Sequence, residues 1–440
     1  MTDLQLGIAS LPILLLLIFL RMPIGLAMLV VGLGGTAWVS GGSLVVLAKL
    51  KSETYSTFSS YSLSIVPLFL LMGQFATLGG MSTSLFKAAE SWLGHRKGGV
   101  AMAAVGACAG FGSICGSSLA TAATMGQVAM PELKRYGYSG GLSTATLAAG
   151  GTLGILIPPS VVLVIYAILT EQNIAKLFLA AFIPGFLAAL GYMITISIYM
   201  RLSPGNAQVR PRVAYRQRLA ALVEVWPVLL VFFLVVGGIY LGWFTPTEAA
   251  AIGAAGTGII ALINGGLTRQ SFTDSILATA SNSAMIFIII LGAGFFNAFL
   301  ALTQVPQEIS QFVTAQGFSP WVILLIILAL YLIFGCVMDS LSMILLTIPI
   351  FFPIISVLDF GLTAEETAIW FGILVLIVVE VGLITPPVGM NLFVINAMDR
   401  STRIIDTYKS VLPFVASDIV RTGLLVAFPG ITLFLLRWVY

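Results

Sequence analysis

Residues Gly151–Leu169 read GTLGILIPPSVVLVIYAIL, and two adjacent prolines, Pro158 and Pro159, lie inside this run without any charged neighbour. Proline removes a backbone donor and its ring clashes with the preceding turn, so the stretch cannot form one regular helix. In hydrocarbon an unpaired backbone group is costly unless it is buried in protein or lines a cavity. The stretch therefore predicts a discontinuous helix whose break has a functional role.

The composition is that of an integral membrane protein. The chain has 440 residues, of which 59% are hydrophobic and 8% charged, whereas soluble domains carry about 25% charged residues. We expect an all-α polytopic protein, and the absence of a basic domain argues against nucleic acid as a partner. Cys108, Cys115 and Cys336 form no CxxC pair, which argues against a disulfide framework or a transition-metal site, and the single His95 lies in the polar segment GHRKGG.

Charge placement predicts the orientation in the membrane. Asp3 precedes the first apolar run and Arg21 follows it, which indicates a retained span with its N-terminus outside and not a signal peptide. The polar stretch Arg201–Arg218 holds five arginines and no acid, so we expect it to be cytoplasmic. A second basic stretch at 400–409 places the C-terminus outside.

Several of the expected apolar segments are too long or too broken for a simple span of about 20 residues. The segments expected are 5–20, 23–40, 62–79, 99–125, 144–169, 174–200, 224–242, 247–264, 276–300, 321–355, 368–398 and 411–437. Those at 99–125, 144–169, 321–355 and 368–398 have Gly, Ser, Thr or Pro at their centres and are expected to be hairpins or discontinuous helices.

The double proline occurs twice, within an internal repeat. GILIPPSVVLVIYAIL (Gly154–Leu169) matches GLITPPVGMNLFVINA (Gly382–Ala397). Upstream of each, FGSICGSSLATAA (Phe111–Ala123) matches FGCVMDSLSMILL (Phe334–Leu346). Still further upstream, LLMG at 70–73 parallels IILG at 289–292. Three elements in the same order indicate two related halves.

Broken segments at matching places in two halves are the best sequence indicator of a transporter binding site. Free carbonyl and hydroxyl oxygens suit sodium, and helix N-termini suit a carboxylate. Tight helix packing is the alternative interpretation of the small residues, because Gly106 and Gly110, like Gly112 and Gly116, form GxxxG pairs. For any one serine the two interpretations stay open, whereas the whole pattern favours a site.

Acidic residues within the apolar segments are further candidates for the binding site. Asp339 lies in the polar break of the second half, where an acid is a functional hypothesis by default, and a helix-end acid in a loop is the alternative. Glu380 precedes the second double proline and is of similar interest. Asp418 and Arg421 are expected to form an i,i+3 pair inside a helix, and Glu248 is expected to lie in the first turn of a helix.

SICGSSLATAATMGQVAMPELKRYGY, GTLGILIPPS and GLITPPVGMNLFV together resemble the large membrane subunit of tripartite ATP-independent periplasmic (TRAP) transporters, the DctM-like family. The resemblance covers essentially the whole chain. It implies an elevator fold with a scaffold, a moving transport domain, two re-entrant hairpins and two inverted repeats. It also implies sodium-coupled uptake of an organic acid, such as a C4-dicarboxylate or sialic acid, across the bacterial inner membrane.

The same resemblance implies two partners, a small four-helix membrane subunit and a periplasmic substrate-binding protein, with sodium as the coupling ion, no other cofactor and no enzymatic activity. It also implies this division of the chain: 1–60 scaffold, 61–200 first repeat, 201–218 cytoplasmic loop, 219–275 scaffold, 276–410 second repeat and 411–440 a C-terminal helix.

Carried over residue by residue, the resemblance implies two sodium sites and a substrate site between them. The first sodium site comprises Cys115, Ser117, Ser118, Gly154, Ile157 and Pro158. The second comprises Met338, Asp339, Ser340, Ser342, Gly382, Thr385 and Pro387. The substrate site comprises Ser117, Ser160 and Asp339. Cys115 stands where family members often have Ser, and a thiol is a poor sodium ligand, so its backbone carbonyl would have to serve. Glu380 stands where Asn is common.

Three other functions are weighed against this one. A self-sufficient sodium/carboxylate symporter would need no binding protein. An intramembrane enzyme is disfavoured, because the sequence has no HExxH motif, no second intramembrane Asp motif and no Ser/His or Ser/Lys arrangement. A channel would need a repeated pore element with rings of carbonyls or charges, which two asymmetric halves do not offer.

Overall fold

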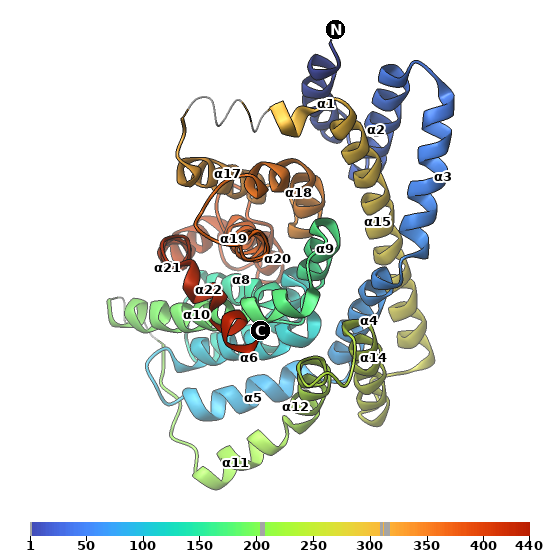
Figure 1. Ribbon diagram of the computed structural model, residues 1–440. Coiled ribbons are helices and arrows are strands. Elements are labelled where there is room, and N and C mark those ends of the chain that lie inside the picture. The colour runs from blue at the N-terminus through green and yellow to red at the C-terminus, as the bar shows by residue number, and fades with distance from the viewer. Residues whose placement is uncertain (1, 203–206, 309–310, 312–316) are drawn as a thin grey trace.

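The computed structural model describes residues 2–202, 207–308, 311 and 317–440, and every regular element among them is helical (Figure 1). The first half comprises α1 (Asp3–Phe19), α2 (Ile24–Ser40), α3 (Ser43–Ser59), η1 (Tyr61–Ser64), α4 (Ile65–Leu78), α5 (Met81–Leu93), α6 (Gly99–Cys115), α7 (Ser118–Arg135), α8 (Gly140–Leu156), α9 (Val161–Thr170) and α10 (Ile174–Leu202). The second half comprises α11 (Tyr215–Val223), α12 (Trp226–Phe232), η2 (Phe233–Gly237), α13 (Gly238–Tyr240), α14 (Pro246–Ile263), α15 (Arg269–Leu302), α17 (Pro320–Gly335), α18 (Ser340–Ser356), α19 (Ala364–Leu383), α20 (Met390–Met398), α21 (Ile404–Ala427) and α22 (Pro429–Val439).

The predicted discontinuities are confirmed. At the first double proline, α8 and α9 are separate helices bent by 43°. At the second, residues 384–389 separate α19 from α20. The segments expected at 99–125 and 321–355 are the helix pairs α6/α7 and α17/α18, each interrupted by a short non-helical tip. The peptide bonds Pro158–Pro159 and Pro386–Pro387 are both cis.

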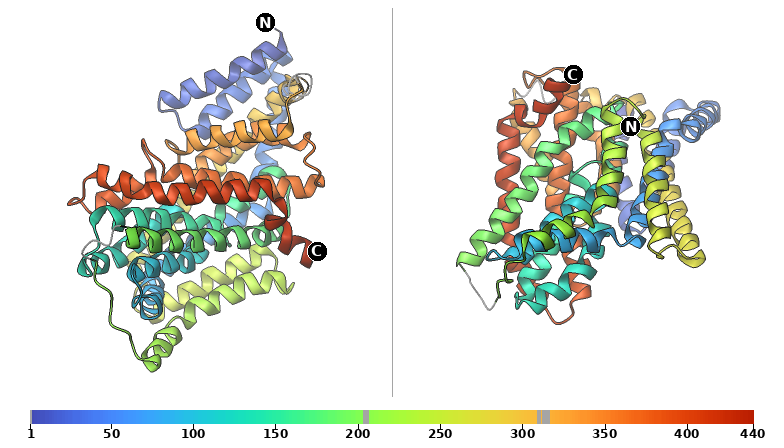
Figure 2. Two further views of the ribbon diagram at one scale, coloured as in Figure 1. Left: turned by 90° about the vertical axis from the view of Figure 1, so that its left-hand side faces the viewer. Right: turned by 90° about the horizontal axis from the view of Figure 1, so that it is seen from below.

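The helices form two groups (Figure 1). One holds α1–α4, α14 and α15, and the other holds α6–α10 and α17–α22. Within the second group α10, α19 and α21 pack side by side (Figure 2). The groups meet where α4 contacts α6 and α9 and where α15 contacts α18. The two hairpins therefore lie in one group and touch the other.

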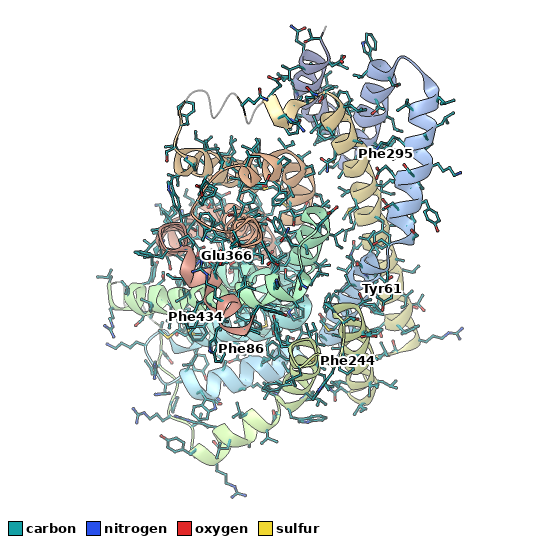
Figure 3. All side chains as sticks on the ribbon, viewed as in Figure 1. Tyr61, Phe86, Phe244, Phe295, Glu366 and Phe434 are labelled. Atoms are coloured by element: carbon teal, nitrogen blue, oxygen red, sulfur yellow. The ribbon has the colours of Figure 1, made fainter. Side chains whose placement is uncertain are left out.

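Glycines allow the closest approach inside the first group. A Cβ on Gly32 of α2 would lie 2.6 Å from the carbonyl carbon of Phe295 on α15. Figure 3 labels Phe295 at this contact, where α2 and α15 run together. Such contact between backbones is the usual way in which helices associate in lipid, where no hydrophobic force holds them together.

The membrane character of the chain is plain from its helices. Among the described residues six helices are long and apolar enough to cross a membrane, and eight are if each of two bent pairs counts as one span. The arms of the two hairpins are shorter apolar helices, except for the more polar α7. Helix α19 is buried on every side, so it forms the centre of the second group.

Helices α3 and α5 lie in segments where no membrane span was expected, and neither is among the described helices that are long and apolar enough to cross a membrane. Two other predictions were wrong. The single helix expected over 411–440 is two helices, α21 and α22, which meet at Phe428. The expected loop 201–218 is helical at both ends, and its residues 203–206 lie outside the described residues.

Candidate ion and substrate site

The tips of the two hairpins meet around a small cavity. Its volume is about 90 Å³, well below the several hundred Å³ of a typical ligand pocket. It has room for ions, water or one small acidic group. The lining residues are Leu70, Gly116, Ser117, Ser118, Leu119, Ile155, Val161, Val162, Ile286, Asp339, Ser340 and Leu341. Four of the predicted ligand residues, two from each half of the chain, thus share one cavity, and their roles as ligands stay predictions.

Two helices begin at this cavity. Ser117 is the N-cap of α7, where its hydroxyl accepts a hydrogen bond from the Ala120 amide at 3.4 Å. Asp339 is the N-cap of α18, where its carboxylate accepts one from the Ser342 amide at 3.0 Å. Asp339 is therefore a helix-end acid, the alternative that the sequence left open, and it also lines the cavity. The partial positive charge of both helix N-termini favours an anion here.

Pairs of glycines hold each hairpin against its broken helix. A Cβ on Gly112 of α6 would lie 2.4 Å from the Cα of Gly154 on α8. In the second half, a Cβ on Gly335 of α17 would lie 3.1 Å from the Cα of Gly382 on α19. These are the glycines that the internal repeat aligns. Each tip therefore lies against the break of its own half because no side chain separates the two backbones.

The remaining residues predicted for the first sodium site lie around this contact. Cys115 is buried at the end of α6, and its carbonyl oxygen is 3.0 Å from where a Cβ on Gly73 would be. Ile157 is the C-cap of α8, immediately before Pro158. Ser160, predicted for the substrate, is fully buried as the N-cap of α9 and is not among the residues that line the cavity. Val161 and Val162 line it instead.

In the second half, hydrogen bonds join the break between α19 and α20 to the hairpin and to α21. The Gly389 amide donates a hydrogen bond to the Cys336 carbonyl at 3.1 Å. The Thr385 hydroxyl donates to the Val381 carbonyl at 2.6 Å. The carbonyl of Pro387, a predicted sodium ligand, already accepts a hydrogen bond from the Tyr408 hydroxyl at 2.7 Å.

The same half holds Met338 and Ser342 at the second tip, on either side of the Asp339–Ser340 start of α18. Ser342 is buried. Neither residue is among those that line the cavity.

Glu380 lies at the junction of both hairpins, although no predicted ligand set included it. Its Oε1 accepts hydrogen bonds from the Ser340 hydroxyl at 2.6 Å and from the Ser118 hydroxyl at 3.1 Å. The side chain is 1% exposed, and Oε2 has no hydrogen-bond partner among the described residues. The sequence had already singled out Glu380 as an acid before the second double proline, and it precedes Gly382 by the spacing at which polar Thr152 precedes Gly154.

The other predicted acids have structural roles. Asp418 and Arg421 form the expected pair at 2.9 Å, and both are buried. Asp418 also accepts a hydrogen bond from the Tyr192 hydroxyl at 2.7 Å, and Tyr192 lies 3.0 Å from the Thr152 hydroxyl of α8. Glu248 lies in the first turn of α14 and forms a capping box with its N-cap residue.

Comparison with known proteins adds the family. A family model described as "Tripartite ATP-independent periplasmic transporter, DctM component" matches residues 11–431. The chain is 38% identical to a C4-dicarboxylate TRAP transporter large permease protein DctM of Pseudomonas aeruginosa, over 92% of this chain and 93% of that protein. It is 33% identical to an isethionate TRAP transporter permease protein DctMQ of Oleidesulfovibrio alaskensis, over 88% of this chain and 60% of that protein.

The fold is shared with a solved structure. The YdaH transporter of Alcanivorax borkumensis, described as having an unusual topology, superposes with a TM-score of 0.63 and 15% sequence identity. The match covers 88% of this chain and 90% of that one.

Proposed function

Because the chain belongs to the DctM family and is thus the large permease subunit of a TRAP transporter, we propose that it carries an organic acid into the cell together with sodium. One observation carries this proposal: the two hairpin tips, from related halves of the chain, share one small cavity with hydroxyls, a carboxylate and two helix N-termini. Hydroxyl, carbonyl and carboxylate oxygens suit sodium, and helix N-termini suit a carboxylate or sulfonate.

The size of the cavity fits a closed state of such a carrier. At about 90 Å³ it has room for the acidic head of a substrate and not for a large molecule. An organic acid larger than this would require the two tips to separate. The second group of helices, which holds both hairpins, is the candidate moving part, and α1–α4, α14 and α15 are the candidate scaffold.

The orientation follows from the charges beside the two hairpins. Basic residues flank the first hairpin: Arg96, Lys97, Lys134 and Arg135. The segments beside the second, 303–320 and 357–366, contain no lysine or arginine. By the positive-inside rule the first hairpin enters from the cytoplasm and the second from the periplasm, which is the arrangement of inverted repeats. Residues 201–218 are then cytoplasmic, and both termini are periplasmic.

The proposed partners are a small four-helix membrane subunit and a periplasmic protein that delivers the substrate. The relatives carry a dicarboxylate in one case and isethionate in the other, by their names. The proposed substrate is therefore a small organic anion.

The test is uptake of a C4-dicarboxylate into proteoliposomes that contain the chain and both partners. Substrate should accumulate under an inward sodium gradient and not under an equal potassium gradient. Accumulation without sodium would refute sodium coupling. Uptake that persists at full rate without the binding protein would instead support the stand-alone symporter.

A further inference from the structure

We propose that Glu380 is a positioning residue shared by the two proposed sodium sites, and that it orients one serine hydroxyl of each. This inference rests on the sodium coupling proposed above. It assigns a role to a residue outside both proposed ligand sets. The carboxylate lies on α19, whereas the two hydroxyls belong to the two hairpin tips.

The contacts are unusual in joining three distant parts of the chain at one atom. Oε1 of Glu380 accepts from Ser118, which is 262 residues away, and from Ser340, which is 40 residues away. All three side chains are buried, with exposures of 1%, 1% and 4% for Glu380, Ser118 and Ser340. A carboxylate in such a place is a functional hypothesis by default, because it is costly to keep inside a membrane protein.

The position of the two serines explains why they need an external acceptor. Two other hydroxyls near the breaks donate to a backbone carbonyl three or four residues earlier, Ser113 to Gly110 and Thr385 to Val381. Ser118 and Ser340 are the first residues of α7 and α18, so no turn of their own helix precedes them. Glu380 supplies the acceptor that these two hydroxyls lack.

Donation to Glu380 leaves each hydroxyl ready to bind a cation. A hydroxyl has one proton and two acceptor lone pairs. When the serine hydroxyl donates its hydrogen bond to the carboxylate, both lone pairs of the hydroxyl oxygen stay free for sodium. The same hydrogen bond makes that oxygen more electron-rich. Removing such a supporting partner from a metal ligand typically costs 10–100-fold in metal affinity. Because one oxygen serves both serines, the two sodium sites should also be coupled through Glu380.

The experiment compares Glu380→Ala with Glu380→Gln, in uptake with both partners and in thermal unfolding of the purified chain in sodium and in potassium. We expect the alanine variant to need roughly 10–100-fold more sodium for half-maximal uptake and to show a flatter sodium dependence. We expect the glutamine variant, whose amide oxygen accepts the same two protons, to stay within about threefold of the wild type. Sodium-specific thermal stabilisation should follow the same order.

Tyr331→Phe is the matched control. It removes a buried hydroxyl of α17 that accepts from Thr347, away from the cavity, and should leave the sodium titration unchanged. A double-mutant cycle of Ser118→Ala and Ser340→Ala should show coupling of at least about threefold in the wild type and none in Glu380→Ala.

Three results would overturn the inference. Wild-type sodium dependence in Glu380→Ala would remove the positioning role. A loss in Glu380→Gln as large as in Glu380→Ala would show that the charge matters, not the orientation. If the wild type itself lacks sodium dependence in both assays, the proposed function fails and this inference fails with it, whereas the first two results leave sodium coupling intact.

Discussion

Gly112 of α6 and Gly154 of α8 touch through their backbones, because a Cβ on Gly112 would lie only 2.4 Å from the Cα of Gly154. Gly335 and Gly382 make the matching contact in the second half. Helix pairs in membranes use glycine in this way, since van der Waals packing is the main force available to them. The contact presses each hairpin tip against the break in its own half.

Gly154→Ala should therefore disturb the first tip. The added methyl would lie 2.4 Å from the Thr121 hydroxyl oxygen and 2.8 Å from the Ser117 carbonyl oxygen. Forced overpacking of this kind costs about 1–3 kcal/mol, and we expect a lower unfolding midpoint in detergent together with reduced uptake. Gly423→Ala is the control, since nothing lies within 4 Å of the methyl it adds. Equal midpoints for the two variants would contradict the packing argument.

Replacing Pro158 and Pro159 together by alanine should let α8 continue into α9. The 43° bend would then relax, and the backbone groups freed by the break would pair within the helix. We expect uptake to fall by roughly tenfold or more, as small displacements in a site do, with expression and subunit assembly retained. Pro184→Ala, inside the unbroken α10, controls for the loss of a proline. Normal uptake with unchanged sodium dependence would make the break purely structural.

Asp339→Asn isolates charge from shape. Asparagine caps helices as well as aspartate does, so α18 should still begin at the same place. If the carboxylate helps to hold sodium, half-saturation should require roughly tenfold more sodium, or about 1.4 kcal/mol. If it only shapes the substrate pocket, the substrate titration should move and the sodium titration should not. Wild-type curves in both titrations would exclude Asp339 from the site.

Lys134→Met tests the ion pair between Lys134, in the last turn of α7, and Asp399. Lys134 lies 2.6 Å from Asp399, whose side chain is 1% exposed. Burial raises the pKa of Asp399, but the hydrogen bonds from Lys134, Ser401 and Thr402 outweigh it and lower the pKa to about 2. Loss of the lysine leaves a buried carboxylate without its cation, and because Lys134 is itself half-exposed we expect a cost of about 2 kcal/mol.

The pH dependence of the same pair has a definite sign. A carboxyl group whose pKa is lower in the folded than in the unfolded protein stabilises the fold at pH values above its unfolded-state pKa. This contribution is lost as the pH falls towards its folded-state pKa. For Asp399 the loss runs from its ordinary value of 3.8 down to about 2. The unfolding midpoint of the wild type should fall in this range by more than that of Lys134→Met. Parallel pH profiles would show that the pair does not stabilise the fold.

The sequence was sufficient to predict the breaks because proline and glycine act locally. Pro158, Gly116 and the residues around Asp339 interrupt helices wherever the rest of the chain leads. The sequence could not show that Ser118 and Ser340 share Glu380, since that contact depends on how three helices pack. Ser160, predicted for the substrate, caps α9 through its hydroxyl and does not line the cavity, and its role in substrate binding stays a prediction.

The two related halves have matching backbone breaks but differ in where their acidic residues lie. Thr152 and Glu380 occupy the same position relative to their glycine and double proline. Glu380 brings a carboxylate to the tips directly, whereas Thr152 reaches Asp418 only through the hydroxyl of Tyr192, on a third helix. The unequal placement of these acids makes the two halves chemically distinct although their backbones correspond, so one tip cannot replace the other without changing the hydrogen bonds at the cavity.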